Sequence, residues 1–132
     1  MTYKVESTFI TKGLSSFSLG NQTLQVDVSK ERDESLPGPA ELLLTALSSC
    51  ILKNIERFSE MLKFEYETVS LKIEADRRES PPKFTEIRYV VFLKTNEDQH
   101  RIDLLHKNVQ KFGTVYNSLS EEIKILGNIE KV

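Results

Sequence analysis

The sequence contains little cysteine and no marked excess of charge of either sign. Cys50 is the only cysteine among 132 residues, which excludes an internal disulfide framework. The 18 lysine and arginine residues are scattered among 20 aspartate and glutamate residues, giving a formal net charge of −2 at pH 7. Because nucleic-acid-binding domains usually carry a clustered basic stripe, we do not expect a nucleic-acid partner.

Long apolar segments are also missing. No apolar run reaches the roughly 18 residues that are needed to span a bilayer, so we expect no membrane partner. The N-terminal segment MTYKVESTFI alternates polar and apolar residues, whereas a secretory signal needs a continuous apolar core. We therefore expect a cytoplasmic protein, in which a single thiol is available for chemistry if another molecule resolves its oxidised form.

The two histidines do not form a metal-binding pair. His100 and His106 are six positions apart, which places them about 240° apart around a helix. They cannot bind one ion from the same face, so we interpret both as solvent-exposed helix residues. We predict no metal and no other cofactor.

Hydrophobic periodicity predicts a single α+β domain over residues 1–132, with the order βββ-α-ββ-αα-β and antiparallel sheets around a long central helix. A chain of this length buries roughly two-thirds of its unfolded surface. The elements expected in chain order are a strand at 2–11, a hairpin at 17–29, a helix at 39–62, strands at 68–77 and 86–95, helices at 97–112 and 114–120, and a strand at 122–132.

The segments between these elements also carry signals. The charged, proline-containing stretch at 29–39 and the stretch RESPPKF at 78–84 are expected to be surface loops. Asn96 is a candidate cap for the helix that begins near residue 97. Gly113 is expected to end that helix in the left-handed conformation, where the absence of a Cβ removes strain.

The long helix predicts a second copy of the chain. Pro39 suits its first position, where the missing N–H costs nothing. The other faces of the first three turns carry apolar or small residues, which is more apolar surface than one small sheet covers. We therefore predict a homodimer. The core stripe of this helix consists of Leu44, Leu47, Ile51, Ile55, Phe58 and Leu62.

Cys50 admits two interpretations. A free cysteine is usually an inert, small, buried hydrophobic residue. However, Cys50 lies about 110° from the centre of the core stripe, beside Ala46 and Ser49, whose small side chains leave space for a substrate and equally suit close helix packing. A nucleophilic thiol needs a cation or a helix N-terminus, and Cys50 is too far into the helix for the latter. Lys12, from the first turn region, is a candidate cation.

Two basic residues on the same helix, Lys53 and Arg57, are further candidates, although such side chains are usually solvated. Glu41 is expected at the third helical position, where a carboxylate caps backbone N–H groups. A functional role would be to orient a cation or a substrate proton beside the sulfur. Nine helical residues turn through about 900° and rise about 13 Å, so Glu41 can join Cys50 in one site only if it comes from a second chain.

At LPGPAELLLTALSSC the sequence resembles the OsmC/Ohr family, the osmotically inducible and organic-hydroperoxide-resistance proteins. A proline-glutamate-leucine start is followed, about nine residues later, by two small residues and a cysteine, and the element order is similar across nearly the whole chain. The resemblance implies an intertwined homodimer with two interface sites. In the family's peroxidases, the helix cysteine attacks a hydroperoxide, and a second cysteine closes a disulfide that a dithiol reopens.

The sequence departs from the family pattern at three positions. The second cysteine is missing, because KFGTVYNSL places Gly113 or Thr114 at its position. The family glutamate usually stands ten residues before the cysteine; here that residue is Ala40, and Glu41 follows it. The expected arginine is also absent, and the segment ITKGLSS offers only Lys12. We therefore predict weak or absent turnover with a lipoyl-type dithiol.

Two functions follow. The first is a one-cysteine OsmC-like redox protein that reduces a hydroperoxide and is restored by an external thiol. In this function Cys50 is the nucleophile, Glu41 of a second chain is a polar helper, and Lys12 is the cation. The alternative is a non-catalytic protein of the same fold that binds a small apolar ligand at the dimer interface. The residues expected to line the substrate or ligand site are Ala46, Phe112 and Tyr116.

Overall fold

The computed structural model describes residues 1–31 and 35–132. Its element order is βββ-α-ββ-αα-β, which confirms the predicted α+β class and order. Residues 32–34, within the predicted loop at 29–39, lie outside the described part of the chain. The structure divides into two compact units, residues 1–43 and residues 44–132. Each unit is described by itself, and a single domain over residues 1–132 stays a prediction.

The first unit contains a three-stranded antiparallel sheet with the order β1-β2-β3. Its strands are β1 (Glu6–Thr11), β2 (Leu14–Leu19) and β3 (Gln22–Asp27). The predicted turn at Gly20 is confirmed: Leu19 pairs with Gln22, and Gly20 has a φ of 61°, which suits the first loop position of a two-residue hairpin. Every residue of β1 is exposed.

The sheet of the second unit has the order β4-β5-β6. Its strands are β4 (Thr68–Glu79), β5 (Pro82–Lys94) and β6 (Lys124–Lys131). β4 and β5 are antiparallel, but β6 runs parallel to β5, so the prediction of antiparallel sheets is wrong for this pair. The reason lies in the connection: two helices between β5 and β6 return the chain to the starting end of β5, as a parallel pair requires.

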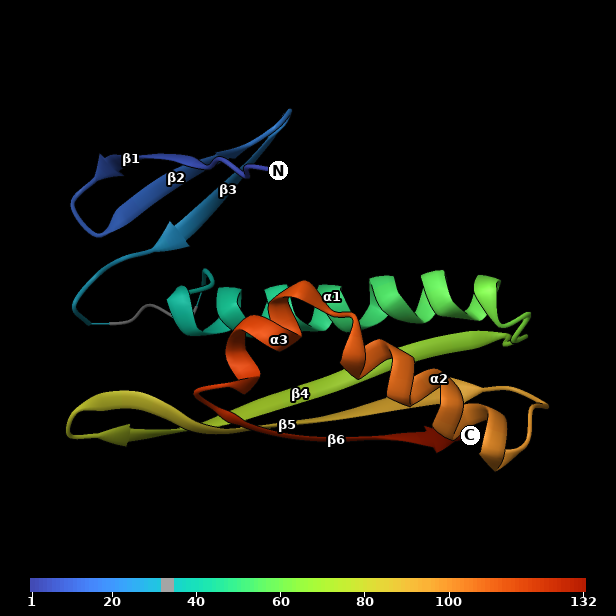
Figure 1. Cartoon of the computed structure of the whole chain (residues 1–132). Helices are drawn as coiled ribbons and strands as arrows, with labels where there is room; N and C mark the ends of the chain where they lie inside the picture. The colour runs from blue at the N-terminus through green and yellow to red at the C-terminus, as the bar shows by residue number, and fades with distance from the viewer. Residues whose placement is uncertain (32–34) are drawn as a thin grey trace. The chain divides into compact units, whose positions relative to one another are not determined.

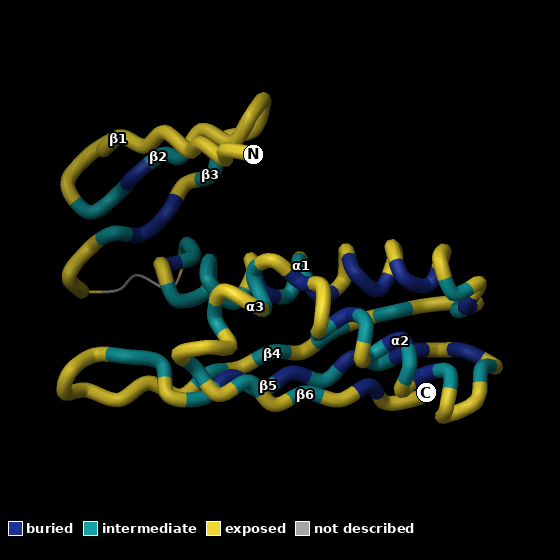
Figure 2. Tube along the Cα trace, in the orientation of Figure 1, coloured by how far each residue is buried: buried dark blue, intermediate teal, exposed yellow. Residues whose placement is uncertain are grey.

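The helices of the second unit lie on one face of this sheet (Figure 1). They are α1 (Pro39–Met61), which belongs to this unit from Leu44 onward, α2 (Gln99–Lys111) and α3 (Thr114–Ser120). Figure 2 shows the buried positions along α1, α2 and the sheet. The buried apolar side chains of the unit are Leu47, Ile51, Ile55, Phe58, Phe64, Ile87, Tyr89, Val91, Leu93, Ile102, Leu105, Val109 and Ile129.

Two local predictions are corrected by the structure. The N-cap of α2 is Asp98 rather than Asn96, because the Asp98 carboxylate accepts a hydrogen bond from the backbone N–H of Arg101 at 2.9 Å. The predicted loop at 78–84 is a tight turn, because β4 continues to Glu79 and β5 begins at Pro82. In the described part of the chain, no helix is long and apolar enough to cross a membrane.

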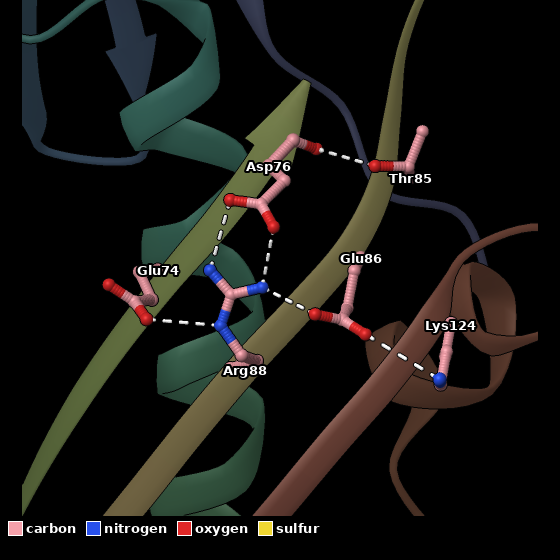
Figure 3. Close-up of polar contacts among 6 residues, drawn as sticks. All are labelled: Glu74, Asp76, Thr85, Glu86, Arg88 and Lys124. Carbon is pink, nitrogen blue, oxygen red and sulfur yellow. Dashed lines mark hydrogen bonds and ion pairs between the residues drawn. The ribbon is translucent and has the colours of Figure 1, made fainter. Parts of the chain in front are cut away.

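The face of β4–β5 away from the helices carries a charged cluster centred on Arg88 (Figure 3). The guanidinium donates hydrogen bonds to Glu74 at 3.0 Å and to both carboxylate oxygens of Asp76 at 2.7 and 3.0 Å, and it also pairs with Glu86. Hydrogen bonding from Arg88 lowers the pKa of the Asp76 carboxyl below its ordinary value. Ile87 and Tyr89, which alternate with Arg88 along β5, point to the opposite face and are buried in the apolar core.

Candidate functional site

The Cys50 side chain lies on the flank of α1, half-buried. Its sulfur accepts a hydrogen bond from Nδ2 of Asn54, one helical turn later, at a distance of 3.9 Å. Asn54 itself is only 7% exposed. The i and i+4 positions of a helix lie one above the other, so the local geometry of α1 alone brings this polar amide to the sulfur.

A third residue, Gly113, approaches the same sulfur from a distant part of the sequence. α2 ends at Phe112, and Gly113 is the N-cap of α3. A Cβ built on Gly113 would lie 3.0 Å from the sulfur of Cys50, 3.2 Å from Nδ2 of Asn54 and 3.0 Å from Cβ of Tyr116. We call Cys50, Asn54, Gly113 and Tyr116 the thiol cluster.

The reason for glycine at position 113 differs from the prediction. Gly113 has φ −81° and ψ 117°, an extended conformation that any residue adopts, so the left-handed helix end expected there is wrong. Glycine fits here because a Cβ would make tight contacts with Cys50, Asn54 and Tyr116. The chain at the α2–α3 junction therefore packs directly over the sulfur.

A part-buried polar network joins Tyr89 of β5 to His106 and Gln110 of α2. Gln110 Nε2 donates a hydrogen bond to the Tyr89 hydroxyl at 3.2 Å, and this hydroxyl lies 2.6 Å from Nε2 of His106. Burial raises the pKa of the Tyr89 and Tyr116 hydroxyls, and the side-chain hydrogen bond with Gln110 opposes both shifts. Burial also lowers the pKa of His106, so the interpretation of His106 as a solvent-exposed residue is wrong.

The burial of His106 predicts that the protein loses stability as the pH falls. The unfolded chain binds a proton with the ordinary histidine pKa of about 6.5, whereas desolvation lowers the pKa of His106 in the folded state. Below about pH 6.5 the unfolded state therefore binds more protons, and the free energy of unfolding decreases until the folded-state pKa is passed. Urea unfolding at several pH values between about 7.5 and 5 measures this slope.

A matched pair of variants isolates the contribution of His106. We expect His106→Gln to flatten the pH dependence in this window, because it removes the titrating group from the Tyr89 hydrogen bond. His100→Gln replaces an exposed histidine on the same helix and should leave the slope unchanged. An equal slope in the wild type and in His106→Gln would contradict the assignment.

The structure brings some of the sequence-predicted site residues together. Tyr116 and Cys50 both lie beside Gly113, since a Cβ at Gly113 would be 3.0 Å from the Cys50 sulfur and 3.0 Å from Cβ of Tyr116. Ala46 lies one turn before Cys50 on α1 and is exposed. Phe112 is 46% exposed, and its ring packs at 5.3 Å from the ring of Phe58.

The polar residues predicted for the site are placed differently. Lys12 is exposed in the turn between β1 and β2, and Glu41 lies in the first turn of α1; both belong to the first unit. A Cβ built on Gly38 would lie 3.6 Å from Oε2 of Glu41, which agrees with a structural role of this carboxylate at the helix start. On α1, Lys53 is exposed, and the Arg57 guanidinium lies over the Phe58 ring, 5.1 Å from its centroid.

Asn54 and the network around Tyr89 were not recognised from the sequence. The one signal for Asn54 was its position four residues after Cys50, a polar residue beside the core stripe. For Gly113 the signal was the family resemblance, which places it or Thr114 at the position of the second cysteine. His106 had no such signal, because its partner Tyr89 is distant in the sequence. Among the described residues, no group of three or more histidine, cysteine, aspartate or glutamate side chains is arranged to hold a metal ion.

Comparison with known families decides where the chain belongs. The sequence profile described as "OsmC-like protein" matches residues 22–126, a span that includes α1 with Cys50 and the α2–α3 junction with Gly113. The chain belongs to the OsmC-like family. A sequence search among curated proteins finds no match to this OsmC-like chain.

Solved structures share the fold of this OsmC-like protein at low sequence identity. An OsmC-like protein from Mycoplasma pneumoniae is 15% identical, with a TM-score of 0.91 over 100% of this chain and 98% of that chain. A protein from Legionella pneumophila, described as an organic hydroperoxide resistance protein OsmC and predicted redox protein, is 17% identical, with a TM-score of 0.78 over 100% and 98%. The organic hydroperoxide resistance protein OhrB of Bacillus subtilis is 13% identical, with a TM-score of 0.72 over 97% and 98%.

Proposed function

We propose that this OsmC-like protein reduces organic hydroperoxides through the single thiol of Cys50 and is regenerated by an external thiol. The observation that carries the proposal is the thiol cluster: a half-buried sulfur on α1, with the Asn54 amide on one side and the backbone of Gly113 on another. Two structurally similar proteins are described as organic hydroperoxide resistance proteins, which supports the substrate class.

The proposed reaction balances without a metal or cofactor. The Cys50 thiolate attacks the hydroperoxide, the O–O bond breaks, and an S–O bond forms, giving a sulfenic acid and an alkoxide that takes a proton to become the alcohol. An external thiolate then attacks the sulfenic sulfur and releases water after proton uptake. A second external thiol reduces the mixed disulfide. The hydroperoxide gains two electrons, and two external thiols leave as one disulfide.

The external thiol is required because the chain has one cysteine. The family's second cysteine would close an internal disulfide, whereas here the residue over the sulfur is Gly113. A sulfenic acid without a resolving thiol waits for an external thiol or oxidises further. We therefore expect low turnover with a lipoyl-type dithiol and faster recovery with a small monothiol that can enter beside Gly113.

The proposal includes a homodimer in which Glu41 and Lys12 serve as helpers from a second copy of the chain. It is supported by apolar side chains that a single chain leaves exposed, with Phe9 71% and Ile10 47% exposed on β1 and Leu52 36% exposed on α1. The proposal expects the second chain to bury these side chains, since contiguous apolar patches mark association surfaces. A sedimentation mass of one chain would contradict this part of the proposal.

The test compares consumption of cumene hydroperoxide by the wild type and by Cys50→Ser, with a small thiol as reductant. We expect Cys50→Ser to reduce the rate to that of the thiol alone and to abolish labelling by a sulfenic-acid reagent, because the sulfur is the reacting atom. Ser49→Ala is the control, since Ser49 is exposed on α1 and its hydroxyl donates a hydrogen bond to the Thr45 carbonyl within the helix. Equal consumption in the wild type and Cys50→Ser would exclude the proposed reaction.

The alternative, binding of a small apolar ligand without catalysis, is favoured by one observation. Phe112 exposes 46% of its surface directly before Gly113, and its ring packs against Phe58. Two results together would support this alternative. The wild type would form no sulfenic acid and would be alkylated slowly at Cys50, and it would bind an apolar fluorescent dye that Phe112→Ala no longer binds.

A further inference from the structure

Asn54 is a buried amide whose polar contacts are unusual. Its residue exposure is 7%, and within residues 1–31 and 35–132 the only hydrogen bond of its side chain goes to the sulfur of Cys50. Buried side-chain amides normally pair with oxygen acceptors. A neutral thiol is a weak acceptor, so the position of Asn54 is poorly explained by the protonated form of Cys50.

Several features hold the amide in place. Asn54 lies on α1 between the buried Ile51 and Phe58, on the side of the helix that faces the core. A Cβ at Gly113 would lie 3.2 Å from Nδ2, so the backbone of the α2–α3 junction closes the space on that side. The amide is therefore pre-positioned before any substrate arrives, which is the condition for a hydrogen-bond donor to stabilise charge that develops during a reaction.

We propose that Asn54 is a catalytic hydrogen-bond donor that stabilises the Cys50 sulfur in its thiolate form and so replaces part of the role of the missing family arginine. This inference rests on the proposed function of Cys50. Hydrogen bonds to a charged acceptor are stronger than those between neutral groups. The hydrogen bond strengthens as the thiol loses its proton, and Nδ2 of Asn54 lies 3.9 Å from the sulfur that attacks the hydroperoxide.

The neighbouring groups make Asn54 the donor with the best-defined geometry. Lys53 is exposed on α1, and the Arg57 guanidinium lies over the ring of Phe58. Tyr116, from α3, is half-buried beside Gly113. In the described part of the chain, the hydrogen bond that reaches the sulfur is the one from Asn54.

The test measures ionisation of Cys50 directly in the full-length protein. The readouts are the ultraviolet absorbance of the thiolate as a function of pH and the rate of alkylation by iodoacetamide at pH 7. Asn54→Leu keeps the approximate size and removes the donor, whereas Asn54→Asp keeps the shape and adds a negative charge. We expect alkylation to slow about tenfold in Asn54→Leu and more in Asn54→Asp, because a hydrogen bond to an anion is worth about one decade or more.

Controls separate this role from a structural one. Asn108→Asp makes the same change in an amide that donates to a carbonyl within α2, and it should leave the alkylation rate unchanged. If Asn54→Leu does not fold, Asn54→Ala removes the same donor without adding volume. Rates within twofold of the wild type in both folded Asn54 variants, with an unmoved thiolate titration, would overturn the inference.

The outcome can be separated from that of the proposed function. If the wild type reduces hydroperoxide and both Asn54 variants have the same thiolate titration and turnover as the wild type, the proposed function stands. The role of Asn54 is then rejected. Conversely, slower alkylation in the variants, together with a wild type inactive toward every hydroperoxide tested, supports the hydrogen bond and rejects peroxide as the substrate class.

Discussion

Gly113→Cys is expected to form an intramolecular disulfide with Cys50 on mild oxidation. The Cβ position at residue 113 lies 3.0 Å from the Cys50 sulfur, and in a disulfide with an S–S bond of about 2.0 Å each Cβ lies roughly 3 Å from the opposite sulfur. The backbone at Gly113, with φ −81° and ψ 117°, accepts a side chain without strain. The close contacts with Cβ of Tyr116, at 3.0 Å, and with Nδ2 of Asn54, at 3.2 Å, both require small adjustments.

This bond should stabilise the protein substantially. It closes a loop of roughly 60 residues, for which the chain-entropy relation gives about 4 kcal/mol, less any strain from the Tyr116 contact. Urea unfolding of the oxidised and reduced variant, together with thiol titration, measures both effects. Gly113→Ser is the control, since it adds a Cβ and one further atom without forming a bond. Two free thiols after oxidation would contradict the observed geometry.

The same variant tests the chemistry. An internal second thiol would resolve the Cys50 sulfenic acid within the chain, so we expect hydroperoxide turnover with a dithiol reductant to increase relative to the wild type. Because the bond closes and opens in each cycle, the stabilisation and the activity should depend on the same pair of sulfurs, and Cys50→Ser in this background should abolish both.

Gly127→Ala is expected to be among the most destabilising single substitutions in the second unit. Gly127 in β6 pairs with Tyr89 in the parallel β5–β6 register, and a Cβ at Gly127 would overlap the Tyr89 ring. The ring is 2% exposed and cannot move into solvent without breaking the hydrogen bond between its hydroxyl and His106. Overpacking of a core typically costs 1–3 kcal/mol, and we expect a loss of about 3 kcal/mol.

A double-mutant cycle checks the cause of that loss. In a Tyr89→Leu background the ring is absent, so Gly127→Ala should cost far less than in the wild type. Asn128→Ala, at the exposed neighbouring position of β6, is the control for a general effect on strand stability. Additive losses in the cycle would show that the overlap with Tyr89 is not the reason.

Much of the fold was predictable because its signals are local. Alternation in β4 and β5 and the apolar stripe of α1 each arise from residues within one element, and the Gly20 turn needs only its own backbone geometry. The structure confirms these elements and their order. Cys50 was found by the same local argument, since it is the one cysteine and stands on the flank of a long helix.

The errors at His106 and β6 occurred because the decisive contacts are between segments distant in the sequence. The exposed position predicted for His106 is wrong, because the Tyr89 hydroxyl from β5 lies 2.6 Å from its Nε2. The parallel direction of β6 depends on how α2 and α3 return the chain. The cap predicted at Asn96 is wrong for a local reason: the side chain that accepts from the backbone N–H of Arg101 is Asp98, two residues later.

The sequence by itself determined the element order, the family pattern, and the loss of the second cysteine that limits the chemistry to one thiol. Only the tertiary structure decided what surrounds that thiol. The approach of Gly113 to Cys50 and Asn54 joins α1 to the α2–α3 junction, roughly 60 residues later. Local periodicity shows which face of a helix is apolar, but a contact across that separation depends on how the whole unit packs.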